Sequence, residues 1–524
     1  MFTPTEEQKA IVEAARGSQK SLMIKAYAGC AKTTTLQLMA EVMPAIPSLA
    51  LAFNVKIKKE LESRFPKHFQ VKTLNGLGHA AWAQALGGVK LELDDKKLGK
   101  IVTKVLKDAR QDQDDDNWVQ VRDLASKAMQ LGLVPSDFPH KSLVPDTEDG
   151  WGQVADCLFD PPSQELFPLA RKVVVENVKL AYDGVISFDD QIYMSAMYGG
   201  QFRKYAQVLV DEGQDLSPLN HIMVEKSLTP EGRLMVCGDP KQAIYAFRGA
   251  DSSSMEKLRR LRKTEDWIDL PLATTFRCPK IIVDRQQKHA PGFRAADSAP
   301  LGAFKRWMKE GEGAQIHWLG AKHDGWTAKW LLDIAATGGH SSVAVLCRNN
   351  APLLSLAFKL IRAGVPPVML GRDIGKGLIS LSKKILPKDT TLAADCLRLI
   401  EEWRDKEVSL ARVNKAKEKV AGIQDRAECL IAVLEGVQAK DAAALRKALD
   451  SLFGRETGRV TLATGHRAKG LEWGTILHLD SWRIPSRFAL EDPSQMEQER
   501  NLLYVIETRA KQTLIEANLE DFIL

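Results

Sequence analysis

The chain has little cysteine, no long apolar run and no low-complexity tract. Its seven cysteines, at positions 30, 157, 237, 278, 347, 396 and 429, are scattered and include no Cys-x-x-Cys pair. We therefore expect neither a disulfide framework nor a cysteine-based zinc site, and this usage fits a reducing compartment. The N-terminus lacks a basic region followed by an apolar segment, and no run approaches the roughly 18 apolar residues of a membrane span. These absences predict a cytoplasmic protein with no membrane partner.

Neither sign of charge dominates the composition. Lys and Arg number 73 against 67 Asp and Glu, which gives a net charge of +6. This balance permits a nucleic-acid partner without requiring one. At 524 residues the chain is too long for a single hydrophobic core, and about two to four domains are expected. Function must therefore be inferred from motifs.

Strand and helix patterns alternate in two parts of the chain, as a parallel α/β fold requires. Helices are expected at 5–16 and 32–43, and short apolar strands at 21–26, 49–53, 71–73, 208–210, 234–237, 316–318, 343–347, 460–464 and 475–479. Helical spacing replaces this pattern over 80–184 and 372–457, which we interpret as insertions. The predicted fold class is α/β, with one parallel-sheet domain formed by 1–79 and 185–271 and a second by 272–371 and 458–524. The basic run 415–419 is interpreted as a solvated helix face in preference to a DNA contact.

A loop between a predicted strand and a predicted helix is a candidate phosphate-binding site. It reads Ala-Tyr-Ala-Gly-Cys-Ala-Lys-Thr-Thr from Ala26 to Thr34. In such a loop, backbone N–H groups and a helix N-terminus surround the phosphates, a lysine adds charge, and a hydroxyl ligates Mg²⁺. Lys32 and Thr33 fit these last two roles. The strict pattern Gly-x-x-x-x-Gly-Lys-Thr fails at both glycines, because Ala26 and Ala31 stand there. For this segment alone, an ordinary strand-to-helix turn without a bound phosphate remains an alternative interpretation.

Acidic residues follow directly after a second apolar strand, within Val208-Leu-Val-Asp-Glu-Gly-Gln-Asp215. Adjacent buried carboxylates carry a desolvation penalty that a cation offsets. The alternative is a solvent-facing loop. Together with the upstream loop, these residues predict NTP hydrolysis, with Asp211 and Thr33 as Mg²⁺ ligands and Glu212 as the general base for the attacking water.

Further segments resemble, in order, the motifs of the UvrD/Rep/PcrA-type superfamily 1 DNA helicases. Gly238–Ala250 looks like motif III, Ala463–Trp473 like motif V and Glu499–Arg509 like motif VI. Shorter segments are similar to the family's remaining motifs: Gln8 (Q motif), Leu51–Asn54 (motif Ia), Thr73–Gly78 (the next DNA-contact segment), Thr274–Arg277 (motif IV) and Val345–Asn350 (motif IVa). Together these matches are far more specific than a phosphate loop alone. The chain therefore resembles a compact superfamily 1A member.

The resemblance implies two RecA-like domains, 1A and 2A, with 80–184 and 372–457 as insertions 1B and 2B. It implies ATP as the nucleotide and Mg²⁺ as its cofactor. Gln242 would sense the γ-phosphate, and Arg277 and Arg509 would stabilise charge in the transition state. The implied nucleotide-binding residues are Gln8, Ala28, Gly29, Cys30, Ala31, Lys32, Thr33, Thr34, Phe276 (on adenine), Gly470 and Glu472 (on ribose). Surface ion pairs for the two arginines, and a core position for Phe276, are the alternatives.

The same resemblance implies a path for single-stranded DNA. A translocase must accept any sequence, so we expect stacking and backbone contacts instead of base-edge reading. Phe53 and Phe247 are the aromatic candidates, although a lone phenylalanine is more often a core residue. The remaining expected DNA contacts are Asn54, Thr73, Asn75, Arg248, Arg348, Asn350, Thr464 and His466.

Three functional interpretations follow. The preferred one is an ATP-dependent helicase that moves 3′ to 5′ on single strands and acts at single-strand/duplex junctions, a polarity inherited from the resemblance. The second is a translocase that strips bound proteins without efficient unwinding. The third is a nonhydrolysing, ATP-gated single-strand-binding protein, which Ala26 and Ala31 motivate. Only seven residues precede Gln8 and fifteen follow Arg509, so we expect no appended nuclease, F-box or polymerase-tethering domain at the ends. A monomer is the expected oligomeric state.

Overall fold

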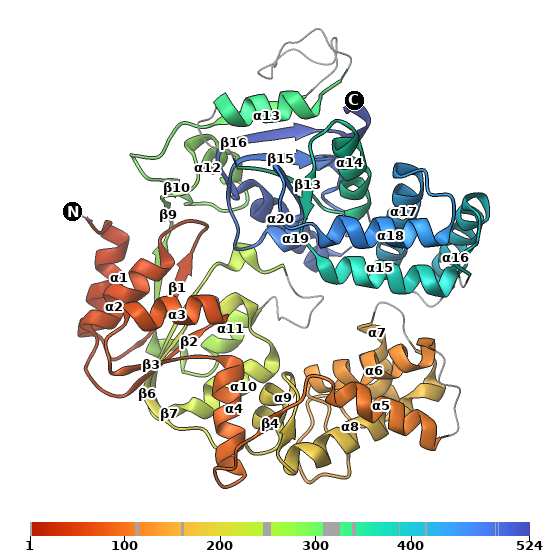
Figure 1. The fold of residues 1–524 in the computed structure, drawn as a ribbon. Coiled ribbons are helices and arrows are strands. Elements are labelled where there is room, and N and C mark those ends of the chain that lie inside the picture. Colours follow the sequence, from red (N-terminus) through yellow and green to blue (C-terminus); the bar gives the residue numbers. More distant parts are fainter. Residues whose placement is uncertain are drawn as a thin grey trace. The chain divides into compact units, whose positions relative to one another are not determined.

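The protein folds into two compact units, Met1–Ala273 and Thr274–Leu524 (Figure 1). Each unit holds one six-stranded sheet in which all neighbouring strands are parallel. This confirms the predicted α/β class with two RecA-like domains. The computed structural model describes residues 3–109, 115–158, 162–244, 253–307, 325–337, 342–386, 388–413, 417–487, 489–490 and 492–524.

The first sheet has the strand order β3-β2-β6-β7-β1-β8. Its strands are β1 (Ser21–Ala26), β2 (Ser48–Ala52), β3 (Phe69–Thr73), β6 (Tyr205–Val210), β7 (Leu228–Gly238) and β8 (Trp267–Leu272). The apolar run of β1 is buried except at Lys25, as expected for a strand covered on both faces. The helices around this sheet are α1 (Glu6–Gly17), α2 (Lys32–Val42), α3 (Val55–Arg64), α4 (Leu74–Ala85), α9 (Asp190–Met197), α10 (Pro218–Ser227) and α11 (Ser254–Arg259).

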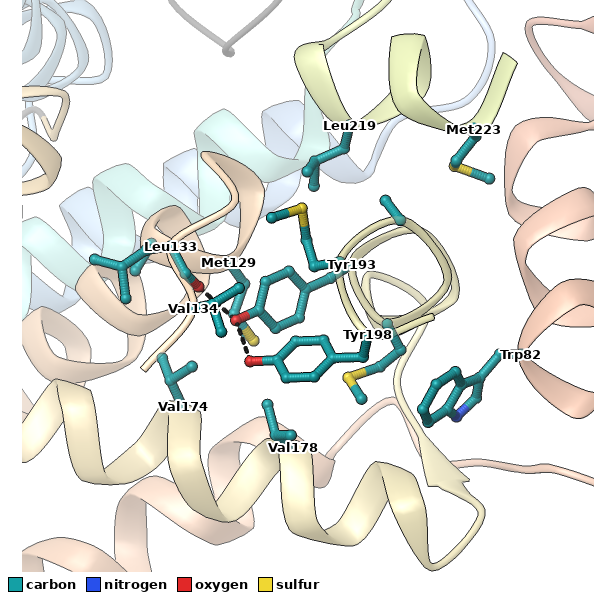
Figure 2. Packing of buried hydrophobic residues seen from close by; sticks show 14 of the residues in the cluster. Trp82, Met129, Leu133, Val134, Val174, Val178, Tyr193, Tyr198, Leu219 and Met223 are labelled. Carbon is teal, nitrogen blue, oxygen red and sulfur yellow. Dashed lines mark hydrogen bonds between the residues drawn. The ribbon is translucent and has the colours of Figure 1, made fainter. Parts of the chain in front are cut away.

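Helices fill the first insertion, as predicted. They are α5 (Lys97–Asp108), α6 (Asp115–Gln130), α7 (Glu148–Asp156) and α8 (Phe167–Tyr182), beside a short parallel pair, β4 (Glu92–Leu93) and β5 (Val185–Ile186). Figure 2 shows Tyr193 of α9 among side chains of α6, α8 and α10, where its hydroxyl donates to Leu133 O at 2.5 Å and lies 3.0 Å from the Tyr198 hydroxyl. Leu49 of β2 belongs to the same core, and α4 runs through the expected boundary at 79/80. One core therefore joins sheet and insertion, and we propose that the insertion begins only after α4.

The second sheet has the order β11-β16-β15-β12-β14-β13. Its strands are β11 (Ala303–Arg306), β12 (Val343–Cys347), β13 (Pro367–Met369), β14 (Val460–Thr464), β15 (Trp473–Leu479) and β16 (Ala510–Ala517). A two-stranded pair, β9 (Thr274–Thr275) and β10 (Arg294–Ala295), accompanies it. The helices beside the sheet are α12 (Lys280–Gln286), α13 (Ala328–Thr337), α14 (Asn350–Arg362), α19 (Gly465–Ala468) and α20 (Pro493–Glu507).

The second insertion is helical as well. It contains α15 (Arg372–Ile385), α16 (Ala393–Val413), α17 (Lys417–Gly436) and α18 (Ala442–Gly454). The expected strand at 316–318 and the side chains of the basic run 415–419 lie outside the described residues. Across the described part of the chain, no helix is both long and apolar enough to cross a bilayer.

Candidate nucleotide-binding and DNA-binding sites

The predicted phosphate loop connects the end of β1, an inner strand of its sheet, to the start of α2. Gly29 has φ of 71° and Ala31 has φ of 54°, so the loop adopts the left-handed conformation twice. Within the described residues, Ala31 caps α2 without a side-chain hydrogen bond. The first N–H groups of α2 therefore face an anion-binding position without a competing side-chain cap. Ala31 occupies the position of the second glycine in the strict phosphate-loop pattern, and its backbone conformation is one that favours glycine.

The phosphate-loop lysine and the acidic cluster meet in the first unit. Lys32 Nζ lies 2.7 Å from Glu212 Oε1, although 180 residues separate them in sequence. The contact forms because β1 and β6 are parallel strands of one sheet, so both residues follow strand ends at the same edge. Gln214 Nε2 donates to the other Glu212 oxygen at 2.6 Å. The structure thus brings the predicted phosphate loop and the predicted acidic cluster into contact, as NTP hydrolysis requires.

Burial dominates the electrostatics of this edge. It raises the pKa of Asp211 to about 7, and the neighbouring Glu212 carboxylate adds to the shift. It also raises the pKa of Asp239 to about 6. Burial alone would lower the pKa of Lys32, but the carboxylates of Glu212 and Asp211 outweigh it and raise that pKa above its ordinary value. The site therefore holds more buried carboxylate than Lys32 neutralises, which suits an added cation.

The donor set fits Mg²⁺ bound together with a nucleotide. No group of three or more His, Cys, Asp or Glu side chains among the described residues is placed to hold a metal ion by itself. Mg²⁺ commonly uses only one or two protein ligands and completes its shell with water and substrate phosphates. Asp211 and the Thr33 hydroxyl, at the start of α2, offer such oxygen ligands.

Gln242 belongs to the same network. Its Nε2 donates to Asp239 Oδ2 at 2.6 Å, and Asp239 N donates to Gln214 Oε1 at 2.9 Å. The chain of contacts from Gln242 to Glu212 passes through Gln214 and Asp239, which the sequence reasoning did not select as site residues. Both lie inside the segments that carried the resemblance, at the ends of β6 and β7, and this position is the signal that could have identified them.

Gln8, the expected adenine reader, is buried and helps to build α1. Thr5 Oγ1 accepts from Gln8 N at 3.2 Å, while Thr5 N donates to Gln8 Oε1 at 3.0 Å, which completes a capping box. Gln8 Nε2 also donates to Thr35 Oγ1 at 3.0 Å. Its amide therefore ties α1 to α2, next to the phosphate loop. Adenine recognition by Gln8 stays a prediction.

Several of the nucleotide-binding residues expected from the second unit are partly exposed, in contrast to Arg509. Arg277 Nε lies 2.6 Å from Glu472 Oε2, and Lys511 also pairs with Glu472 at 3.2 Å. Burial raises the pKa of Glu472, but these cations outweigh it and lower that pKa below its ordinary value. Phe276 is 46% exposed, so the alternative of a core position for this ring is wrong. Gly470 has φ of 82° in the turn before Glu472.

Arg509 is fully buried, which excludes the alternative of a surface ion pair. Its exposed fraction is 1%. The guanidinium donates to Val505 O at 3.0 Å, to Leu471 O at 3.3 Å and to Thr508 Oγ1 at 3.1 Å. The side chain therefore lies inside the second unit, between α20 and the segment before β15.

The expected DNA contacts of the first unit lie at the ends of neighbouring strands. Phe53 follows β2 and is 46% exposed, so it is a surface ring and not a core residue. Thr73 ends β3 opposite Ala52 of β2 and accepts from Gly76 N at 3.1 Å. Asn54 accepts from Ile57 N at 2.9 Å and so caps α3. Phe247 and Arg248 lie outside the described residues.

Sequence reasoning missed one exposed ring beside these residues. Asn75 Nδ2 donates to Phe188 O at 2.9 Å, and the Phe188 side chain is 58% exposed. This ring comes from the segment before α9, more than a hundred residues after Asn75. In the sequence, Phe188 is marked only by its position between Ser187 and Asp189, outside any periodic apolar pattern.

In the second unit, the expected DNA residues again follow parallel strands. Arg348 follows β12 and Thr464 ends the neighbouring strand β14, whose last residue pairs with Cys347. Glu499 of α20 accepts hydrogen bonds from Arg348 Nε at 2.9 Å and from Arg348 Nη2 at 2.7 Å. Thr464 is 7% exposed, and His466 lies in α19 directly after it.

Comparison with known protein families agrees with this arrangement. The UvrD/REP helicase N-terminal domain matches residues 5–263, and the UvrD-like helicase C-terminal domain matches residues 399–518. The chain belongs to the UvrD/REP helicase family. The N-terminal domain match contains every strand of the first sheet except β8, and the C-terminal domain match contains β14, β15 and β16 of the second sheet.

Individual relatives are distant but extend over most of the chain. F-box DNA helicase protein 1 of Schizosaccharomyces pombe is 24% identical over 535 residues, which cover 98% of this chain and 57% of the relative. ATP-dependent DNA helicase UvrD2 of Mycobacterium tuberculosis is 26% identical over 575 residues, covering 97% of this chain and 77% of the relative. UvrD1 of the same species is 28% identical over 310 residues, or 56% of this chain. The chain therefore spans a little over half of the first relative and about three quarters of the second.

Proposed function

We propose that this UvrD/REP family member is an ATP-dependent DNA helicase that translocates 3′ to 5′ on single-stranded DNA and unwinds duplex at junctions. The observation that carries the ATPase part is the 2.7 Å ion pair between Lys32 and Glu212. It links the lysine that we propose binds phosphate to the carboxylate that we propose is the general base. Membership of a helicase family supports the DNA part, and the polarity follows from the family resemblance.

The geometry suggests how the site would work. When ATP enters, its phosphates offer Lys32 a stronger partner than Glu212, and the Glu212 carboxylate is released to take a proton from water. Gln214 keeps that carboxylate oriented through its 2.6 Å hydrogen bond. Mg²⁺, when bound, would neutralise charge on the phosphate oxygens, with Thr33 and Asp211 as its protein ligands. Gln242 is connected to the carboxylates through Asp239 and is the candidate γ-phosphate sensor.

Single-stranded DNA is the proposed partner. In each unit, the candidate contacts follow neighbouring parallel strands: Phe53 and Thr73 after β2 and β3, and Arg348 and Thr464 at β12 and β14. Exposed rings supply stacking surfaces that accept any base. Two such strand-end surfaces, one on each RecA-like domain, support alternating grip on one strand as ATP binds and leaves. Single-strand/duplex junctions would be the loading sites.

A DNA-stimulated ATPase assay tests the first half of the proposal. ATP turnover by the full chain should rise when single-stranded DNA is added, and Lys32→Ala should abolish turnover. If the unmodified chain binds single strands but never hydrolyses ATP, with or without DNA, the proposed ATPase is wrong and a nucleotide-gated binding protein replaces it.

Strand displacement tests the second half. A duplex with a 3′ single-stranded tail should be unwound in the presence of ATP, whereas the same duplex with a 5′ tail should stay intact. Removal of a tightly bound protein from single strands without displacement of either duplex would instead identify a translocase. Unwinding of only the 5′-tailed duplex would reverse the proposed polarity.

A further inference from the structure

A carboxylate of the second insertion caps the helix that follows the candidate strand-binding loop. Asp425 lies in α17, and its Oδ1 accepts from Asn350 N and from Ala351 N, both at 3.1 Å. In the described structure, Asn349, the N-cap residue of α14, makes no side-chain capping bond of its own. The cap of α14 therefore comes from a residue 75 positions further along the chain. An acidic side chain at this end of a helix also interacts favourably with its dipole.

The same carboxylate orients the Asn350 side chain. Asn350 Nδ2 donates to Asp425 Oδ2 at 3.2 Å. Because a carboxylate only accepts hydrogen bonds, the amide NH₂ must face Asp425, and the amide orientation is set by chemistry. On the other side of the loop, Glu499 holds the Arg348 guanidinium at 2.7 Å. Both candidate DNA residues are thus held by carboxylates, one from α17 and one from α20.

The rest of α14 is seated on α17 (Figure 1). Gly436, at the end of α17, lies so close to Phe358 that an added Cβ would stand 2.5 Å from the Phe358 Cδ2 atom. Arg362 donates to Gly436 O at 2.6 Å. A single hydrophobic core contains residues of β12, α14 and the insertion helices, among them Val345, Leu353, Leu430, Val433 and Leu449. The insertion and the helix behind the loop are therefore one packed body.

We propose that Asp425 is a positioning residue for the loop Arg348–Asn350, through which the second insertion sets the geometry of the single-strand contact. The inference rests on the proposed function, because it assumes that this loop touches DNA. Asp425 itself is an anion and repels phosphate, so it would act only through the loop that it caps.

The direction in which DNA affinity changes when Asp425 is removed distinguishes a positioning role from a simple charge effect. Removing a negative charge near a DNA-binding surface normally tightens binding, because fewer charges oppose the phosphates. If Asp425 positions the loop, its removal should weaken binding in spite of the charge change. The matched control is Asp395→Ala, which deletes an exposed carboxylate that pairs with Arg398 on another helix of the same insertion.

The test is the dissociation constant of a fluorescent oligothymidylate, measured with the full chain at fixed salt and well below its melting temperature. Asp425→Ala should weaken binding about tenfold, the equivalent of ~1.4 kcal/mol, and should raise the DNA concentration for half-maximal ATPase without lowering kcat at saturating DNA. Asp425→Asn keeps an oxygen for the two backbone donors and should lose only about threefold. Asp395→Ala should bind as tightly as the unmodified chain or slightly more tightly.

A double substitution shows whether the effect passes through the loop. In an Asn350→Ala background, replacing Asp425 by alanine should add less to the loss than it does alone, because part of its contact is already gone. Equal or tighter binding by Asp425→Ala and Asp425→Asn would overturn the inference while leaving the proposed function intact. Failure of the unmodified chain to bind the oligonucleotide would overturn the proposed function itself. If Asp425→Ala does not fold, the Asp425→Asn result decides alone.

Discussion

The backbone of the phosphate loop is strained at Ala31, which adopts a left-handed conformation. Its φ and ψ are 54° and 42°, a region that costs an L-residue with a Cβ roughly 1–2 kcal/mol. Glycine removes that strain but loses about 0.5–1 kcal/mol more backbone entropy on folding. The difference predicts that Ala31→Gly stabilises the first unit by about 0.5–1 kcal/mol, or about 1–3 °C in melting temperature for a domain of this size. ATP affinity should rise as well, because the backbone can approach phosphate more closely.

The control is the same alanine-to-glycine substitution at Ala28, three residues earlier in the loop. Ala28 is buried and lies outside the left-handed region, so Ala28→Gly only adds freedom to the unfolded chain and removes a packed methyl group. It should lower the stability by about 1 kcal/mol. Both variants are compared with the unmodified chain by thermal unfolding at one protein concentration. If Ala31→Gly lowers the melting temperature as Ala28→Gly does, the reasoning about strain in this loop is refuted.

Three other predictions concern titratable side chains. Lys97 and Asp190 form an ion pair at 2.8 Å with exposed fractions of 1% and 0%, so Lys97→Met should destabilise the first unit by about 3–5 kcal/mol in denaturant unfolding, and adding Asp190→Leu should restore part of that loss. Glu212→Gln should lower the kcat of ATP hydrolysis by about 10²–10⁴ while a fluorescent nucleotide still binds, and undiminished turnover would exclude Glu212 as the base. Burial lowers the pKa of His478 to about 3, so the unfolded state binds the extra proton and stability should rise with pH between about 3 and 6.5. His478→Leu should remove up to ~1.4 kcal/mol per pH unit from that slope, and an unchanged slope would contradict the assignment.

Strand positions could be read from the sequence where strands are buried on both faces. The predicted ranges 21–26, 343–347 and 460–464 coincide with β1, β12 and β14, because such strands appear as short, continuous apolar runs. β13 was not predicted, since it is short and begins at Pro367 after a second proline. β16 was missed because Lys511, Gln512 and Thr513 follow its first residue, Ala510, and this polar run is not typical of a core strand.

The nucleotide site was predictable in its composition and only partly in its geometry. The meeting of Lys32 and Glu212 follows from two strand-end motifs on one parallel sheet, which the sequence indicates. The left-handed backbone of Ala31 and Glu212 does not follow, because neither residue type favours it and the surrounding loop imposes it. Asp425 and Phe188 carry no motif, and their partners lie 75 and 113 positions away. Contacts of this kind depend on tertiary packing that no local pattern encodes.

Arg509 shows why a motif can identify a residue without describing its state. The motif VI resemblance assigns it to the nucleotide, yet in the structure its guanidinium donates to acceptors within its own unit, among them Val505 O, Leu471 O and Thr508 Oγ1. A buried guanidinium is stable only while such acceptors replace water. If Arg509 binds the phosphates, as the resemblance implies, it must exchange some of these carbonyl and hydroxyl oxygens for phosphate oxygens, which are charged and therefore stronger acceptors. The internal contacts then determine how much of the nucleotide's binding energy goes into releasing the arginine, and loosening them through Thr508→Ala should make that release easier.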